Sequence, residues 1–313
     1  MTDAPTTTAA APRATVANPA LSLIVATTHG WPDYREVFLT HRATVEAIGG
    51  ELIVADSSGN HPPSTADVGP SVTWLSSPGA GVYRLRTISY PVTRAPIVAH
   101  TEDHCVLDAG WAGTALELHR LYPGAAVIGA VIENGSQDAL NDWANFFVGH
   151  VWDMPSVGEG RRVDAAGLTC VTYKRRAIEG MTEVGELGVN EAYHQRQLSQ
   201  RGEQVLIDDR LRCSHVQTGG VRMAVSRTWH AARAGAAMRR ERLTPRSVLR
   251  IALTPVLPIV YTAAIARQVA ARRYHRGRAL ASAPYIVGFL GVRAVAEVVG
   301  YVAGMGDSAN RFD

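Results

Sequence analysis

Three consecutive residues with metal-ligating side chains follow a short apolar stretch. Pro96–Thr101 has the composition of a buried strand, and it runs directly into Glu102, Asp103 and His104. Two carboxylates and an imidazole suit Mg²⁺ or Mn²⁺, and a divalent cation at this point would neutralise a diphosphate leaving group. On these residues alone, a solvated acidic turn explains the triplet equally well.

The elements around the triplet alternate between strands and helices. Short apolar runs predict strands at Leu21–Ala26, Glu51–Ala55, Val72–Leu75, Pro96–Thr101, Ala125–Ile132, Gly167–Tyr173 and Gln204–Ile207. Helical spacing and caps predict helices at Asp33–Ile48, Tyr83–Arg94, Trp111–Leu121 and Asn190–Gln200. This alternation predicts an α/β domain with a mostly parallel, Rossmann-like sheet covered on both faces. Ligands bind beyond the carboxyl ends of such strands, where Asp56 and Glu102–His104 fall.

Five segments of the chain, in order, resemble family-2 glycosyltransferases of the GT-A fold. They are Leu21–Thr28, Glu51–Asn60 (ELIVADSSGN), Ile97–Trp111, Gly167–Arg176 and Asn190–His215. In that family an apolar strand ends in a DxD-like acidic triplet, and a Trp follows a few residues later. Here the triplet reads Glu-Asp-His, so its last position offers an imidazole where the family usually has a carboxylate.

The resemblance assigns roles to individual residues. It implies that Asp56 holds the nucleobase or ribose, and that Glu191 is the general base that takes the proton of the acceptor hydroxyl. Further donor contacts are expected from Thr27, Glu102, Arg84 and Arg86, and metal ligands from Asp103, His104 and His215.

The same resemblance implies an inverting glycosyltransferase. Its donor would be a nucleoside-diphosphate sugar, its cofactor Mn²⁺ or Mg²⁺, and its acceptor a hydroxyl of a lipid-linked or cell-envelope glycan, as in polysaccharide biosynthesis. One alternative is a polyprenyl-phosphate sugar synthase, whose ionised phosphate acceptor needs no base. Another is a non-catalytic membrane scaffold of GT-A fold, which would not bind nucleotide-sugars.

Zinc is a further alternative for the site. His100, His104, Cys105, Cys213 and His215 are all zinc-type ligands. His100 and His104 straddle the end of the predicted strand, and the spacing matches no standard zinc finger.

The C-terminal third of the chain is basic and apolar. Residues 222–278 contain thirteen arginines, no lysine and one acid, Glu241. Two apolar stretches, Leu249–Ala266 and Leu280–Ala303, flank the arginine-rich segment Arg267–Arg278. Each stretch is long enough to suggest a transmembrane helix, but two spans would place this segment outside the cell, against the positive-inside rule.

We therefore expect a tail that lies in the inner leaflet, with its arginines on anionic lipid head groups. The alternatives are a soluble helical subdomain or a homodimer interface. Nucleic-acid binding is not expected, because the residues between the arginines are mostly Ala and Val rather than stacking aromatics.

The expected organisation has four parts. A disordered start (residues 1–20) precedes a GT-A domain (21–220), a helical membrane-associated tail (221–306) and a disordered end (307–313). Three widely spaced cysteines without a CxxC motif point to a reducing compartment, and the N-terminus is a poor signal peptide. The expected location is the cytoplasmic face of the inner membrane, as a peripheral or monotopic protein.

Overall fold

The computed structural model of the chain describes residues 8–9, 16–179, 181, 190–217, 219–240, 245–308 and 311. Parts of the two ends predicted to be disordered, residues 1–7, 10–15, 309–310 and 312–313, lie outside the described residues. The chain forms two compact units, one of residues 1–133 and 157–215 and one of residues 134–156 and 216–313. The second unit thus joins the predicted tail with a segment that the sequence analysis placed in the GT-A domain. The predicted domain boundaries stay predictions.

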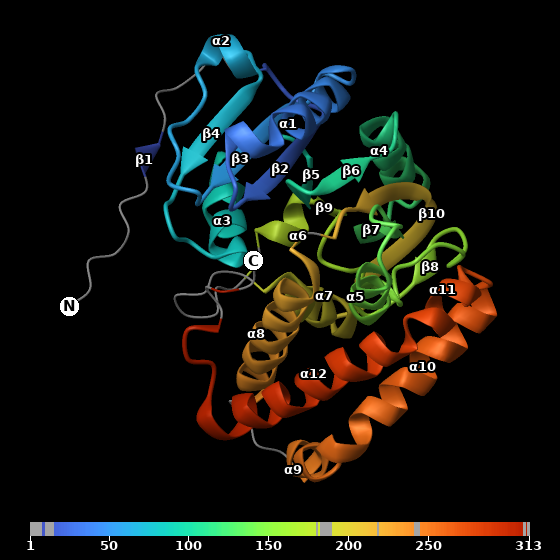
Figure 1. The fold of residues 1–313 in the computed structure, drawn as a ribbon. Helices are drawn as coiled ribbons and strands as arrows, with labels where there is room; N and C mark the ends of the chain where they lie inside the picture. The colour runs from blue at the N-terminus through green and yellow to red at the C-terminus, as the bar shows by residue number, and fades with distance from the viewer. Residues whose placement is uncertain are drawn as a thin grey trace. The chain divides into compact units, whose positions relative to one another are not determined.

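The first unit is built on a ten-stranded sheet. Its strands are β1 (Thr8–Ala9), β2 (Leu21–Thr27), β3 (Glu51–Asp56), β4 (Val72–Ser76), β5 (Ile97–Glu102), β6 (Cys105–Leu107), β7 (Ala125–Asn134), β8 (Arg161–Arg162), β9 (Val171–Lys174) and β10 (Gln204–His215). The order is β1-β4-β3-β2-β5-β9-β7-β10-β6, with β8 paired to β10. Strands β4, β3, β2 and β5 pair in parallel, and antiparallel strands continue the sheet from β9 onward. The predicted α/β fold with its parallel block is confirmed (Figure 1).

Helices cover the parallel block. The first unit contains α1 (Trp31–Glu46), α2 (Thr65–Val68), α3 (Val82–Ser89), the 3₁₀ turn η1 (Tyr90–Val92), α4 (Trp111–Leu121), α6 (Arg175–Ile178) and α7 (Glu191–Gln200). Every residue of β2 and β3 is buried, as expected for strands covered on both faces, and α1 and α3 both pack against these strands. The helix predicted to reach Arg94 stops at Ser89, because Pro91 lies in η1 and cannot donate an α-helical hydrogen bond.

Strand register places the polar ends of the strands side by side. Across β2, Thr27 is in register with Asp56 of β3, and Ala26 with Glu102 of β5. Strand β10 continues eight residues beyond the predicted strand end at Ile207 and pairs antiparallel with β6. The sequence analysis predicted neither β6 nor this extension.

The second unit is helical. It contains α5 (Leu140–His150), α8 (Gly220–Arg240), α9 (Pro245–Ala252), the 3₁₀ turn η3 (Thr254–Val256), α10 (Leu257–Arg272), α11 (Arg276–Ala281) and α12 (Ala283–Ala303). α12 packs against α8, α5 and α10 (Figure 1). A Cβ on Gly300 would lie 2.3 Å from the carbonyl oxygen of Arg233, so glycine allows α12 to approach α8 this closely. Within α12, Arg293 Nε lies 3.3 Å from Glu297 Oε1, one helical turn further on.

Within the described part of the chain, α12 alone has the length and hydropathy to cross a membrane. Its most apolar window is 44% buried. Length and hydropathy do not distinguish a spanning helix from a core helix of a soluble protein, so α12 is weak evidence for a membrane span.

We predict that Gly129→Ala destabilises the first unit. Gly129 lies in β7 opposite Val171, and a Cβ there would come within 2.2 Å of the carbonyl oxygen of Ala166. Overpacking against backbone typically costs about 1–3 kcal/mol of unfolding free energy, which denaturant unfolding followed by circular dichroism would measure. The control is Gly113→Ala in α4, where the nearest atom is 4.0 Å from the added Cβ. The control should be neutral or stabilising, by up to about 1 kcal/mol, and equal losses in the two variants would contradict the packing argument.

Candidate active site

The ligand atoms of Glu102, His104 and His215 meet at the carboxyl end of β5. His104 Nε2 lies 3.0 Å from His215 Nε2 and 3.4 Å from Glu102 Oε2. His215 Nε2 lies 3.7 Å from the same carboxylate oxygen. The chain turns after the triplet into β6, and the antiparallel pairing of β6 with β10 sets His215 opposite Cys105. The structure therefore brings two of the three predicted metal ligands into contact.

Asp103, the third predicted ligand, lies behind His104. Its Oδ1 is 2.8 Å from His104 Nδ1, and its Oδ2 accepts a 2.6 Å hydrogen bond from Thr27 Oγ1. His29 Nδ1 lies 3.1 Å from the same Oδ2. A carboxylate that binds one imidazole nitrogen fixes the ring and directs the other nitrogen toward a metal. These contacts suit an orienting role for Asp103, and its direct ligation of a metal stays a prediction.

Charge is balanced within this cluster. Burial opposes the charged forms of Glu102, Asp103 and His104, but their mutual contacts outweigh it. Hydrogen bonds from histidine side chains hold the pKa of Glu102 and that of Asp103 well below their usual values, and the charge of Arg86 also lowers that of Glu102. The hydrogen bond to Asp103 and the neighbouring negative groups raise the pKa of His104 to about 9.

Arg86 links the triplet to the predicted base. Its Nη2 donates a 2.7 Å hydrogen bond to Glu102 Oε1, and its Nη1 lies 3.5 Å from Glu191 Oε2. The side chains of Arg86 and Glu191 are 1% and 0% exposed. The guanidinium is thus engaged by two carboxylates, and its predicted contact with phosphate stays a prediction.

Glu191 is the first residue of α7, after Asn190, whose side chain caps the helix by accepting from Tyr193 N. Tyr90 Oη donates to Glu191 Oε1 over 3.4 Å, while no hydrogen bond to Oε2 is found among the described residues. Burial raises the pKa of Glu191 above its usual value, which is the direction that a general base at neutral pH requires. No sequence signal connected Tyr90 with Glu191, because the two are 101 residues apart.

The remaining predicted donor residues lie on β2, β3 and α3. Asp56 is buried, and its two oxygens accept hydrogen bonds from Ser58 N at 2.7 Å and Trp74 Nε1 at 3.3 Å. Arg84 is half-buried on α3. The roles predicted for Asp56, Thr27 and Arg84 in donor binding stay predictions.

The donor set fits a single cation. Glu102, His104, Cys105 and His215 each offer a ligand atom, and these atoms all lie within 4.8 Å of one another. The two imidazole nitrogens are 3.0 Å apart, which is close enough for both to bind one ion. Among the sequence-based predictions, Cys105 belongs only to the zinc alternative. His100, also in that alternative, instead lies with its Nε2 2.9 Å from the carbonyl oxygen of Leu168.

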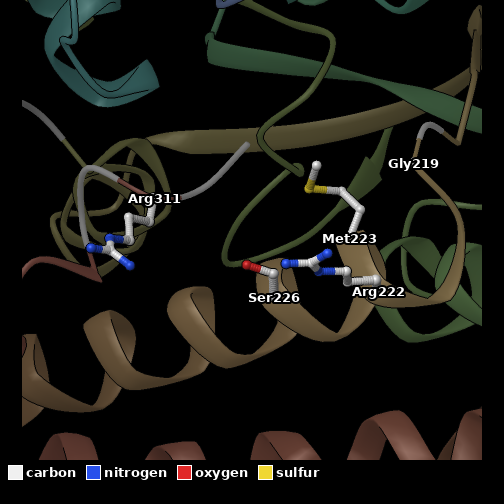
Figure 2. A pocket seen from close by; sticks show the side chains of 5 residues that line it. All are labelled: Gly219, Arg222, Met223, Ser226 and Arg311. Carbon is white, nitrogen blue, oxygen red and sulfur yellow. The ribbon is translucent and has the colours of Figure 1, made fainter.

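The second unit holds a separate cavity of about 510 Å³, which the sequence analysis did not predict. It is lined by Gly219, Arg222, Met223, Ser226 and Arg311 (Figure 2). Its basic character is reduced by an ion pair between Arg311 Nε and Asp307 Oδ2, 2.7 Å apart.

We predict that Arg86→Met destabilises the protein. The substitution leaves Glu102 and Glu191 without their buried guanidinium, and breaking a buried ion pair costs about 3–5 kcal/mol of unfolding free energy. Denaturant unfolding would measure the loss. Adding Glu191→Gln to Arg86→Met should recover part of it, since the double variant no longer buries an unpaired charge at that position. Additive losses in the double variant would show that the two side chains do not interact.

Comparisons with known proteins agree with this fold. No protein-family model matches the chain, and no curated protein matches it. Among solved structures, the chain is similar to the mannosyltransferase PcManGT from Pyrobaculum calidifontis, in complex with GDP-Man and Mn²⁺. The TM-score is 0.53 at 15% sequence identity, over 92% of this chain and 89% of that one. At this identity the likeness concerns the fold, and the chain therefore has a fold that is also found in a glycosyltransferase.

Proposed function

We propose that this protein is a metal-dependent glycosyltransferase of the GT-A type. It would transfer a sugar, with inversion, from a nucleoside-diphosphate sugar to a hydroxyl of a lipid-linked or cell-envelope glycan. The observation that carries the proposal is the convergence of Glu102, His104 and His215 at the carboxyl end of β5. This edge of the sheet is where ligands bind in such folds, and the similar mannosyltransferase structure contains GDP-Man and Mn²⁺.

The proposed metal site consists of His104, His215 and a carboxylate. The sequence analysis assigned that carboxylate to Asp103, whereas the distances favour Glu102 as the direct ligand and Asp103 as the group that orients His104. A bound divalent cation would supply the positive charge that stabilises a departing diphosphate. Asp56 and Thr27 are proposed for the nucleoside side of the donor, and Arg84 for its phosphates.

Glu191 is proposed as the base for the acceptor. Its raised pKa suits a carboxylate that takes a proton from a hydroxyl. Arg86 would act as a positioning residue, because it holds Glu191 and Glu102 in one buried network. A phosphate acceptor, as in a polyprenyl-phosphate sugar synthase, would need no base.

A membrane-proximal acceptor is supported by the surface of the second unit. Of the seventeen exposed large hydrophobic side chains among the described residues, eleven lie between Val248 and Val302. Ile259 is 70% and Leu280 79% exposed. Apolar side chains interspersed with arginines suit an anionic lipid surface, and we place the protein on the cytoplasmic face of the inner membrane.

The donor and the metal can be tested together. We predict that a panel of nucleoside-diphosphate sugars contains one that raises the melting temperature in the presence of Mn²⁺ and does so less after chelation. His104→Ala should lower the affinity for Mn²⁺ and for the donor, each by about 10–100-fold or more, while the exposed His61→Ala should change neither. Full transfer activity in the presence of a chelator would show that the reaction needs no metal. If no nucleotide-sugar raises the melting temperature, the scaffold alternative is favoured.

The acceptor class can be tested at Glu191. Glu191→Gln keeps the shape of the side chain but removes its basic oxygen. If a hydroxyl is the acceptor, we predict that kcat falls by about 10²–10⁴-fold, with donor affinity nearly unchanged. Glu117→Gln, on the exposed side of α4, is the matched control. Unchanged kcat in Glu191→Gln would favour a phosphate acceptor.

Membrane binding can be tested with the full chain. The full chain is needed because α5, α8 and α12 pack on one another. We predict cosedimentation with anionic vesicles that salt weakens but does not abolish, since screening leaves apolar burial intact. Ile259→Asp and Leu280→Asp should reduce the salt-resistant part, and Leu121→Asp in the first unit, 53% exposed, should not. If the protein is monodisperse without detergent and does not bind vesicles, these helices pack against protein instead, as a subdomain or a dimer interface.

A further inference from the structure

Cys105 adds a sulfur ligand to the candidate metal site. Its Sγ belongs to the group of ligand atoms that lie within 4.8 Å of one another, together with atoms of Glu102, His104 and His215. The side chain is fully buried, and the thiol is free of any disulfide. Its position is set by the backbone, because Cys105 begins β6 directly opposite His215 in β10.

The surroundings of Cys105 are rich in thiols. Cys170 and Cys213 are both buried, and each is close enough to Cys105 to affect the pKa of its thiol. Cys213 stands two residues before His215 in β10, so both side chains lie on the same face of the strand. All three cysteines of the chain therefore gather beside the two histidines.

This composition departs from what the proposed reaction needs. Mn²⁺ and Mg²⁺ prefer oxygen ligands, and a thiolate contributes little to their binding. Two imidazoles, one carboxylate and one thiolate instead provide the four nitrogen, oxygen and sulfur ligands of a tetrahedral zinc site.

We propose that the site also binds Zn²⁺ or another thiophilic ion, through Cys105 together with Glu102, His104 and His215. This proposal concerns the same site as the proposed function and rests on it only in that respect. On binding, the thiol of Cys105 loses its proton to solvent as the sulfur–zinc bond forms, and His104 loses its Nε2 proton to solvent as the nitrogen–zinc bond forms. Zn²⁺ then occupies the place of the catalytic cation and competes with Mn²⁺.

Cobalt reports on sulfur ligation directly. The full chain, freed of metal by chelation, is titrated with Co²⁺ and then with Zn²⁺. The expected result is a sulfur-to-cobalt charge-transfer band in the near ultraviolet that saturates at one equivalent and disappears as Zn²⁺ is added. Absence of this band in the unsubstituted protein overturns the proposal, whatever the variants do.

Two serine variants then locate the sulfur. In Cys105→Ser the band should vanish. The Zn²⁺ affinity, measured by competition with a chromophoric chelator, should fall by at least about 100-fold, which is more than the loss of a residue that only hydrogen-bonds a ligand would cause. The Mn²⁺ affinity of the same variant, measured by electron paramagnetic resonance, should change by less than about threefold, which also shows that the site is folded. Cys170→Ser removes a neighbouring buried thiol outside the donor set, and it should keep the band and both affinities.

The outcomes separate this inference from the proposed function. If the band survives in Cys105→Ser, Cys105 is not the ligand. If the band is lost in Cys170→Ser, the sulfur ligand is Cys170, and the assignment to Cys105 is wrong. Stabilisation by Mn²⁺ and a nucleotide-sugar without a cobalt–sulfur band supports the glycosyltransferase and rejects the zinc site. A cobalt–sulfur band without any nucleotide-sugar binding supports the zinc site and rejects the glycosyltransferase.

Discussion

The buried guanidinium of Arg86 is the interaction on which the candidate site depends. Glu102, at the end of β5, and Glu191, at the start of α7, are both removed from most of the solvent. Each buried carboxylate costs several kcal/mol in lost hydration unless an opposite charge compensates it. Arg86 lies between the two and compensates both, so the two carboxylates share one cation.

The histidine and carboxylate contacts extend this network toward the sheet. Thr27, from the end of β2, holds Asp103, which holds His104, which meets His215 from the end of β10. Each group is oriented by the next, so these side chains are already held in place. The same network explains why a buried, charged cluster is tolerated at this edge: every carboxylate in it has a positively charged or hydrogen-bonding partner.

Several arginines of the second unit take part in its own packing. Arg272 donates hydrogen bonds to the carbonyl oxygens of Met154 and Trp152. Arg233 donates to the carbonyl oxygen of Gly304, and Arg239 to Tyr301 Oη. These arginines stabilise the helical packing.

The sequence by itself determined the parallel block and the polar ends of its strands. Continuous apolar runs located β2, β3 and β5, and Asp56 and Glu102 stand at their carboxyl ends as predicted, because a strand buried on both faces must be apolar until it leaves the core. The helix at Trp111–Leu121 has the predicted bounds for a similar local reason, its apolar spacing. Only the tertiary structure decided the rest of the site. The pairing of β6 with β10, the position of Arg86 between two carboxylates and the approach of Cys105 to His215 join residues up to about a hundred positions apart. Such contacts follow from strand pairing and burial across the fold, and no local pattern of residues records them.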